Sequence, residues 1–200
     1  MLLSYGRAFS TGGFSALRGI LFLVVGPSGV GKDSLLDGAR AALSDNSRYA
    51  FPQRIITRPA AAGGEDHRAV SVQEFAEMRA VGAFALSWYA NGLDYAIPAK
   101  IDDLLAEGRH VVVNVSRTIV DDSRRRYQPL RVIVVAAPAD IVAARLAGRG
   151  RESAEDIAER LARGALALPE GPDVGVVVND GSLETGIARM LAALRAPAIA

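Results

Sequence analysis

Apolar runs of strand length alternate along the chain with segments of helical length. Residues 20–25 form a continuous apolar run, which is typical of a central parallel strand buried on both faces. Strands that alternate with helices predict an α/β fold, in which helices cover both faces of a parallel sheet. The expected strands span residues 20–25, 49–57, 84–88, 95–97, 110–115, 130–136 and 174–178. The expected helices span residues 32–43, 98–108 and 138–147, open at Ser71, Ser153 and Ser182, and include a charged segment that ends near Tyr127.

Local signals mark several boundaries of these elements. Ser71-Val-Gln-Glu74 is a capping box, in which the two outer side chains satisfy free amides at the start of a helix. Asn91-Gly92 predicts a tight turn between two short strands. Residues 58–70 are rich in Ala and Gly and predict a loop, whereas Pro98 suits the first turn of a helix.

The composition is that of one globular domain. The chain has 200 residues, of which 50% are hydrophobic and 22% charged, so it can bury a substantial core. No apolar run approaches the roughly 18 residues that a membrane span needs. The net charge of +1 provides no global field to hold nucleic acid or a membrane surface. We expect a soluble, cytoplasmic protein without a nucleic-acid or membrane partner; its oligomeric state stays open, with a homodimer among the options.

Cysteine and histidine usage narrows the chemistry. The chain has no cysteine, which excludes disulfides, thiolate zinc sites and a catalytic Cys, and its two histidines make a His-based metal site unexpected. We assign residues 20–200 to a single domain. Residues 1–19 hold two arginines and no acid, which resembles a transit peptide, but they lack a clear apolar segment or cleavage site. A disordered extension, or a start codon placed too far upstream, is the preferred interpretation.

A glycine-rich segment joins the first expected strand to the first expected helix. It matches the phosphate-loop pattern G-x-x-x-x-G-K-[ST] up to the last position. Glycines let backbone N–H groups point at phosphate oxygens, the helix N-terminus adds positive potential, and Lys32 reaches the β- and γ-phosphates. The expected ATP-binding residues are Gly26, Pro27, Ser28, Gly29, Val30, Gly31, Lys32, Asp33 and Ser34.

The chain departs twice from the usual phosphate-loop chemistry, and both departures concern a magnesium ion. Asp33 stands where the pattern has a hydroxyl, while Asn114 and Ser116 stand where a Walker B carboxylate would end the strand 110–115. A carboxylate beside phosphates repels them unless a cation lies between. We therefore expect Asp33 to face Mg²⁺, directly or through water. The alternative is that Asp33 only stabilises the helix N-terminus.

Together these residues resemble a known family. Residues 25–36 look like the phosphate loop of the guanylate kinase superfamily, and the ending Lys32-Asp33-Ser34 resembles its ribose 1,5-bisphosphate phosphokinase branch. The likeness runs from about residue 20 to 195. Further matching segments are Arg54-Ile-Ile-Thr-Arg58-Pro59, Gly63-Gly-Glu-Asp-His67, Phe84-Ala-Leu-Ser-Trp88, Gly92-Leu-Asp-Tyr95 and Arg145-Leu-Ala-Gly-Arg-Gly-Arg-Glu152.

The resemblance implies a fold and a reaction. The fold is the three-layer P-loop NTPase fold with a central parallel sheet, a small acceptor-binding flap at about 52–98 and an arginine lid at about 145–160. The reaction converts ATP and ribose 1,5-bisphosphate into ADP and 5-phosphoribosyl 1-diphosphate (PRPP), with ATP and Mg²⁺ as cofactors. Its usual setting is phosphonate degradation and PRPP supply.

The acceptor residues favour a sugar bisphosphate over GMP. Guanylate kinases read the guanine edge with acids, but here Phe84-Ala-Leu-Ser-Trp88 and Asn114-Val-Ser116 lack them. The resemblance assigns the acceptor phosphate to Arg54, Arg58 and Tyr95, and the flap would add Glu65 and His67. The alternatives are a solvated strand edge for the arginines, core packing for Tyr95 and an exposed loop position for His67.

The lid and the last strand complete the expected site. The resemblance assigns catalytic roles beside Lys32 to Arg145, Arg149, Arg151 and Arg160, whose guanidinium groups would spread positive charge over the moving phosphoryl. The alternative is a basic helix surface. Asn179 resembles a residue near the adenine pocket, with a helix-start turn as the alternative. The run Arg124–Arg126 is expected to be a solvated helix end.

Two other functions stay open on the sequence. A guanylate or other nucleoside monophosphate kinase would use the same machinery, and only the missing acids argue against it. A non-catalytic guanylate-kinase-like binding module would typically have a degraded phosphate loop, whereas Gly31-Lys32 is intact here.

Overall fold

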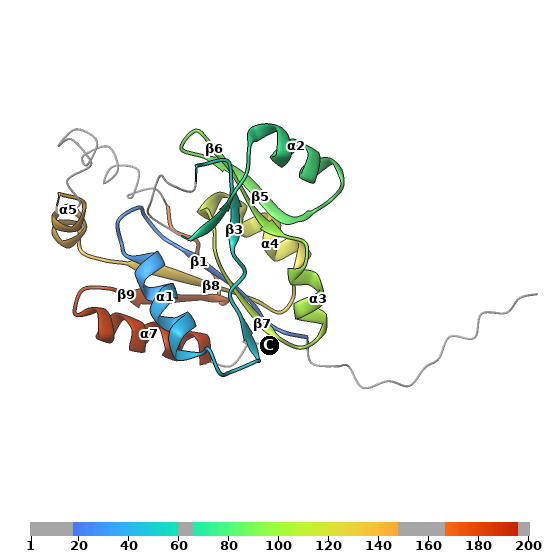
Figure 1. Ribbon diagram of the computed structural model, residues 1–200. Coiled ribbons are helices and arrows are strands. Elements are labelled where there is room, and N and C mark those ends of the chain that lie inside the picture. Colours follow the sequence, from blue (N-terminus) through green and yellow to red (C-terminus); the bar gives the residue numbers. More distant parts are fainter. Residues whose placement is uncertain (1–17, 60–65, 148–166, 196–200) are drawn as a thin grey trace, which may run out of the picture.

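Strand β1 (Leu21–Val25) lies at the centre of a five-stranded sheet, and all five of its side chains are buried. The structure, a computed structural model, describes residues 18–59, 66–147 and 167–195 (Figure 1). The strands of this sheet run parallel in the order β2-β7-β1-β8-β9, which explains why β1 is apolar throughout. Its other strands are β2 (Tyr49–Ala50), β7 (His110–Asn114), β8 (Leu130–Ala136) and β9 (Val174–Val178).

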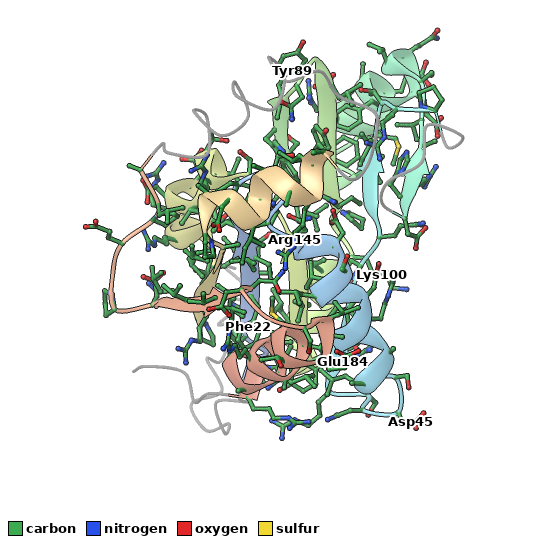
Figure 2. The ribbon with its side chains drawn as sticks, turned by 90° about the vertical axis from the view of Figure 1, so that its left-hand side faces the viewer. Phe22, Asp45, Tyr89, Lys100, Arg145 and Glu184 are labelled. Carbon is green, nitrogen blue, oxygen red and sulfur yellow. The ribbon has the colours of Figure 1, made fainter. Side chains whose placement is uncertain are left out.

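Helices cover both faces of this sheet. One face carries α1 (Lys32–Ala42), α5 (Ala139–Ala147) and α7 (Leu183–Arg195), and the other carries α3 (Ile101–Ala106), α4 (Val120–Arg126) and the 3-10 turn η2 (Arg117–Ile119) (Figure 1). The side chains of β1 point alternately into the hydrophobic clusters on the two faces of the sheet, because successive residues of a strand point to opposite faces. Phe22 packs with the first set, as Figure 2 shows, and Leu23 with the second. The predicted α/β architecture is confirmed.

A second, four-stranded sheet lies beside the central one. Its strands are β4 (His67–Ala69), β3 (Arg54–Ile56), β6 (Leu93–Pro98) and β5 (Phe84–Ala90), in that order, with α2 (Val72–Ala80) packed on it (Figure 1). The pair β3–β4 is parallel, whereas β6 runs antiparallel to both β3 and β5. This sheet occupies the residues for which an acceptor-binding flap is expected.

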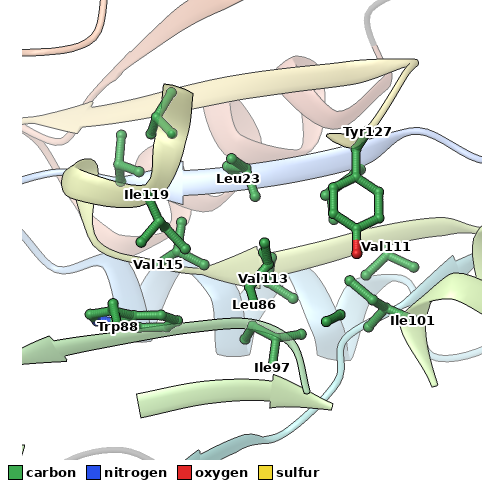
Figure 3. Packing of buried hydrophobic residues seen from close by; sticks show 14 of the residues in the cluster. Leu23, Leu86, Trp88, Ile97, Ile101, Val111, Val113, Val115, Ile119 and Tyr127 are labelled. Carbon is green, nitrogen blue, oxygen red and sulfur yellow. The ribbon is translucent and has the colours of Figure 1, made fainter. Parts of the chain in front are cut away.

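The two sheets share one hydrophobic core. Leu86, Trp88 and Ile97 of the second sheet pack against Val113 and Val115 from the β7 segment (Figure 3). Because all five side chains are at most 8% exposed, the second sheet is anchored to the central one by burial of apolar surface.

Three local signals, at Ser71, Asn91-Gly92 and Ser182, mark element boundaries as expected. The Ser71 hydroxyl accepts a hydrogen bond from the Glu74 amide at 3.0 Å, and the Ser182 hydroxyl accepts one from Thr185 at 3.2 Å. Asn91 and Gly92 join β5 to β6 with φ angles of 51° and 76°. Both angles are positive, as a tight hairpin turn requires. In the ranges that the structure describes, no helix is both long and apolar enough to cross a membrane.

Three boundary predictions are wrong. The expected strand 49–57 is two short strands in different sheets, β2 and β3, with Pro52 between them, which cannot donate to a ladder. The expected loop 58–70 ends in strand β4. Pro98 ends β6 opposite Phe84 rather than opening a helix, and α3 begins only at Ile101. In each case pairing with a distant segment overrides the local signal.

Candidate active site

The phosphate loop connects β1 to α1, and its shape depends on glycine. Gly26 and Gly31 have φ angles of 148° and 91°, a backbone region that L side chains rarely adopt. A Cβ at Gly26 would lie 2.3 Å from the Val135 carbonyl oxygen, and one at Gly31 would lie 2.5 Å from Asn179 Nδ2. Val135 and Asn179 thus pack closely against the loop, and neither glycine position has room for a side chain.

The Lys32 side chain binds back to the first residues of the phosphate loop. Its Nζ donates to the carbonyl oxygens of Gly26 and Pro27, both at 2.8 Å. Burial lowers the pKa of Lys32 to about 8; Asp33 opposes this shift, and Arg54 and Arg117 add to it. A bound anion would offset the cost of burying this ammonium group.

Asp33 links the phosphate loop to both sheets. Its Oδ1 accepts a hydrogen bond from Asn114 Nδ2 at 2.7 Å and one from Arg54 Nη2 at 3.2 Å. Asn114 ends β7 and Arg54 begins β3, so one carboxylate joins the central sheet to the second sheet. The two positions that depart from the phosphate-loop pattern, Asp33 and Asn114, therefore touch each other.

The residues expected at the acceptor phosphate come from three neighbouring strands. Arg54 on β3 lies opposite His67 on β4, and Tyr95 on β6 lies opposite Ile56. His67 is buried rather than exposed, and its Nε2 donates to the Arg58 carbonyl at 3.1 Å. Tyr95 stacks on Trp88 with ring centroids 5.4 Å apart. Glu65 lies outside the residues that the structure describes.

Arg145 and Asn179 reach the phosphate loop from distant parts of the chain. Asn179, which follows β9 and is 4% exposed, donates through Nδ2 to the Val30 carbonyl at 2.7 Å. Arg145 Nη1 donates to the carbonyl oxygens of Asn179 and Val30 at 3.1 and 3.4 Å. Figure 2 shows Arg145 between α5 and the start of α1. Both side chains thus fix the loop conformation; Arg149, Arg151 and Arg160 lie outside the described residues.

Known proteins resemble most of this chain. A guanylate kinase sequence profile matches residues 19–196. The chain belongs to the guanylate kinase family. Its structure resembles the crystal structure of a guanylate kinase from Anaplasma phagocytophilum with a TM-score of 0.64 and 17% identity, covering 89% of this chain and 85% of that one. The predicted P-loop kinase fold is therefore confirmed.

Within the guanylate kinase family, the chain matches ribose 1,5-bisphosphate phosphokinases. It is 46% identical over 182 residues to "Ribose 1,5-bisphosphate phosphokinase PhnN" of Rhizobium etli (strain CIAT 652), covering 91% of this chain and 92% of that protein. It is 49% identical over 177 residues, 88% of this chain, to "Bifunctional ribose 1,5-bisphosphokinase-thymidine phosphorylase" of Cupriavidus pinatubonensis (strain JMP 134 / LMG 1197). The chain spans 29% of the length of that bifunctional protein.

Several polar residues of this guanylate kinase family chain were not expected at the site. Asp66 Oδ1 accepts from Gln53 Nε2 at 2.6 Å, and its Oδ2 accepts from Arg40 at 3.5 Å. Arg117 adds positive charge near Lys32. Asp66 lies within a segment that carries the family resemblance, whereas no motif includes Arg40 or Arg117. Arg40, Gln53 and Asp66 help to form a cavity between α1 and the start of β3. It is lined by Asp33, Leu36, Asp37, Arg40, Phe51, Pro52, Gln53, Arg54, Asp66, Val112 and Asn114.

The donor groups fit a magnesium ion that arrives with a nucleotide. Within the described ranges, no three His, Cys, Asp or Glu residues cluster in a way that could hold a metal by themselves. Asp33 offers one carboxylate, 52% exposed, next to Lys32. Mg²⁺ in kinases commonly keeps several waters and takes one or two carboxylates plus substrate phosphates. A single carboxylate beside the phosphate loop suits that pattern.

Proposed function

We propose that the chain transfers the γ-phosphoryl group of ATP to the 1-phosphate of ribose 1,5-bisphosphate, which yields ADP and PRPP. The observation that carries the proposal is the Asp33–Asn114–Arg54 contact at the mouth of the phosphate loop. The Asn114 amide and the Arg54 guanidinium lie here, and both donate hydrogen bonds to Asp33. Donors suit a phosphorylated sugar, whereas the N–H edge of guanine needs acceptors.

The names of the relatives support this substrate. Two kinds of relative, a stand-alone phosphokinase and a bifunctional protein, carry ribose 1,5-bisphosphate in their names. The N–H edge of a guanine placed against the Arg54 guanidinium, which has no acceptor, would leave its donors unpaired, at about 1–3 kcal/mol for each buried unsatisfied group. This cost disfavours GMP as the acceptor.

Catalysis in this proposal consists of alignment and charge neutralisation. The acceptor phosphate is already ionised near neutral pH, so it needs no general base. Lys32 and the loop amides hold the ATP phosphates, with Gly26–Gly31, Asp33, Ser34 and Asn179 shaping the donor site. Arg54, Arg58, His67 and Tyr95 orient the acceptor, as would Glu65. Alignment of the two reacting groups and fixed positive charge supply the rate enhancement.

The magnesium ion and the lid arginines add positive charge. Asp33 would hold Mg²⁺ directly or through water, and the ion supplies charge neutralisation at the β- and γ-phosphate oxygens. Arg145, Arg149, Arg151 and Arg160 would spread charge over the transferred phosphoryl and exclude water. We place the reaction in the cytoplasm, where ATP is supplied, with phosphonate degradation as its metabolic setting.

A coupled ADP-release assay with Mg-ATP tests the proposal. The acceptors are ribose 1,5-bisphosphate and GMP, and we expect turnover of the sugar bisphosphate alone, with PRPP as the product by mass spectrometry. Lys32→Met should abolish it, whereas Arg125→Ala, an exposed substitution on α4, should not change it. Turnover of GMP alone, or of neither acceptor, would contradict the proposal.

A further inference from the structure

Asp33 lies between the phosphate loop and the second sheet, and its two carboxylate oxygens differ in their contacts. In the part of the chain that the structure describes, the hydrogen bonds from Asn114 Nδ2 and Arg54 Nη2 both end on Oδ1. Oδ2 accepts neither of them, and the side chain is 52% exposed. One oxygen of Asp33 is therefore bonded to the protein, and the other is available to a cation that arrives from solvent.

The contact between Arg54 and Asp33 is suited to exchange. It is a single N–O contact of 3.2 Å, whereas the strong arrangement between an arginine and a carboxylate has two parallel contacts. The Arg54 side chain is 13% exposed, so it can pass from one anion to another while staying largely out of water. Asn114 is uncharged, and its 2.7 Å hydrogen bond would hold the carboxylate in place if Arg54 left.

Arg54 also belongs to the acceptor side of the site. It begins β3, and Ile56, two residues later, lies opposite Tyr95 on β6. Residues two apart in a strand share a face of the sheet, and so do residues directly opposite each other. Arg54 and Tyr95 are therefore on the same face of the second sheet, the face that packs on the central one through Ile56. Arg54 thus connects the phosphate loop to a proposed acceptor residue.

The negative charge of Asp33 is shared between two cations. Burial lowers the pKa of Lys32 to about 8 and also lowers the pKa of Arg54, and Asp33 opposes both shifts. A divalent cation bound to Asp33 would draw on the same charge and repel Arg54. An acceptor phosphate would replace the lost partner, because guanidinium groups bind phosphate through charge-assisted hydrogen bonds.

We propose that Arg54 exchanges partners during the reaction cycle: it pairs with Asp33 in this structure, and with the acceptor phosphate once Asp33 binds the Mg²⁺ that accompanies ATP. This inference rests on the proposed function and deepens it, because the exchange couples the donor site to the acceptor site. Mg-ATP therefore raises the affinity for ribose 1,5-bisphosphate. By thermodynamic reciprocity, the bisphosphate raises the affinity for Mg-ATP by the same factor.

Isothermal titration calorimetry with ribose 1,5-bisphosphate tests the exchange without turnover. The wild type is titrated alone, with saturating Mg²⁺ and the non-hydrolysable ATP analogue AMP-PNP, and with AMP-PNP and EDTA. Mg-AMP-PNP should lower the Kd for the bisphosphate about tenfold, which is a typical coupling between two sites. AMP-PNP with EDTA should not lower this Kd, because Asp33 then keeps Arg54.

Asp33→Asn tests the role of the carboxylate directly. The amide has the size of the native side chain and can still accept from Asn114, but it releases Arg54 from its ion pair. Without nucleotide, this variant should bind the bisphosphate about tenfold more tightly than the wild type does, and Mg-AMP-PNP should then change the Kd less than about twofold.

Two further variants separate the exchange from general repulsion between Asp33 and phosphate. In an Arg54→Ala background, Asp33→Asn should change the Kd for the bisphosphate less than about twofold, because the group that it releases is missing. Asp45→Asn removes the same charge at an exposed position beyond α1 and should match the wild type.

Several results would overturn the exchange. In the wild type, they are an equal effect of AMP-PNP with and without Mg²⁺, or no effect of either, and these hold even if a variant does not fold. In Asp33→Asn, they are weaker binding of the bisphosphate without nucleotide, or tighter binding that persists in the Arg54→Ala background. In all these cases the wild type still turns over ribose 1,5-bisphosphate in the coupled assay. Absence of both binding and turnover counts against the proposed function instead.

Discussion

At the residue scale, Asp33 and Asn114 form a matched exchange. The usual arrangement puts a hydroxyl on the phosphate loop and a carboxylate at the end of the neighbouring strand. Here the carboxylate is on the loop and an amide ends the strand, and the two are 2.7 Å apart. A carboxylate at both positions would set two negative charges in contact, which costs several kcal/mol at the effective dielectric of a protein surface. A carboxylate at position 33 therefore favours a neutral residue at position 114.

This coupling predicts the behaviour of a double mutant. Asn114→Asp should lower kcat/KM for ATP about tenfold or more, because it replaces a donor to Asp33 by a like charge. Adding Asp33→Ser should recover most of that loss, since it restores the usual arrangement. The measurement is the coupled ADP-release assay with varied ATP.

Asp45→Ser in the Asn114→Asp background is the control. Asp45 is exposed at the end of the α1 segment, far from the phosphate loop (Figure 2), so this change should recover nothing. Strictly additive losses from Asn114→Asp and Asp33→Ser would show that the two positions act independently.

At the element scale, the hairpin β5–β6 holds Tyr95 and Trp88 in register for stacking. Trp88 pairs with Tyr95 across the two strands, and the ring planes are 7° from parallel. The turn at Asn91-Gly92 sets this register, because both residues adopt positive φ. The orientation of a proposed acceptor residue thus depends on backbone conformation at a turn of two residues.

Two glycines provide a matched test of that turn. Gly92 has a φ of 76°, and a Cβ there would meet nothing within 4 Å, so Gly92→Ala introduces backbone strain without a clash. It should lower the free energy of unfolding by about 1–2 kcal/mol. Gly175 in β9 has equally open space and no positive φ, so Gly175→Ala should be neutral or stabilise by about 0.4–1 kcal/mol.

Urea unfolding at constant m-value measures both variants. A Gly92→Ala midpoint equal to that of Gly175→Ala would mean that the turn tolerates an L side chain, and the register argument would fail.

At the scale of the whole molecule, the phosphate loop is held by segments far away in the sequence. Asn179 and Val30 are 149 residues apart and joined by a buried hydrogen bond. Arg145 reinforces this contact by donating to both of their carbonyl oxygens. The loop conformation therefore depends on contacts with α5 and with the segment after β9, and we expect nucleotide binding to be coupled to the docking of these elements.

Removal of the Asn179 side chain tests that coupling. Asn179→Ala leaves the buried Val30 carbonyl without its 2.7 Å donor, so unfolding free energy should fall by about 1–3 kcal/mol. The KM for ATP should rise as well. Asn46→Ala is the control, because it removes only an exposed hydrogen bond from the Arg48 amide. It should lower the free energy of unfolding by much less than Asn179→Ala does. Equal losses in chemical denaturation, with unchanged KM for ATP, would contradict the coupling.

Local features of the fold could be predicted from the sequence, whereas contacts between distant segments could not. Buried parallel strands are apolar along their whole length, so β1, β7 and β8 were visible as runs of Val, Leu and Ile. The capping box at Ser71 and the turn at Asn91 were visible because they depend on neighbouring residues only. Arg124 was expected to be solvated, yet it pairs with Asp173, 49 residues away, through two contacts of 2.9 Å.

By itself, the sequence determined the alternation of strands and helices, the phosphate loop and the family, because each follows from local spacing and residue type. Only the tertiary structure decided that residues 49–57 split between two sheets, that Asp33 meets Asn114 and Arg54, and that Arg117 lies near Lys32. These contacts join residues from separate elements. Their formation depends on the packing of the two sheets, which no local pattern encodes.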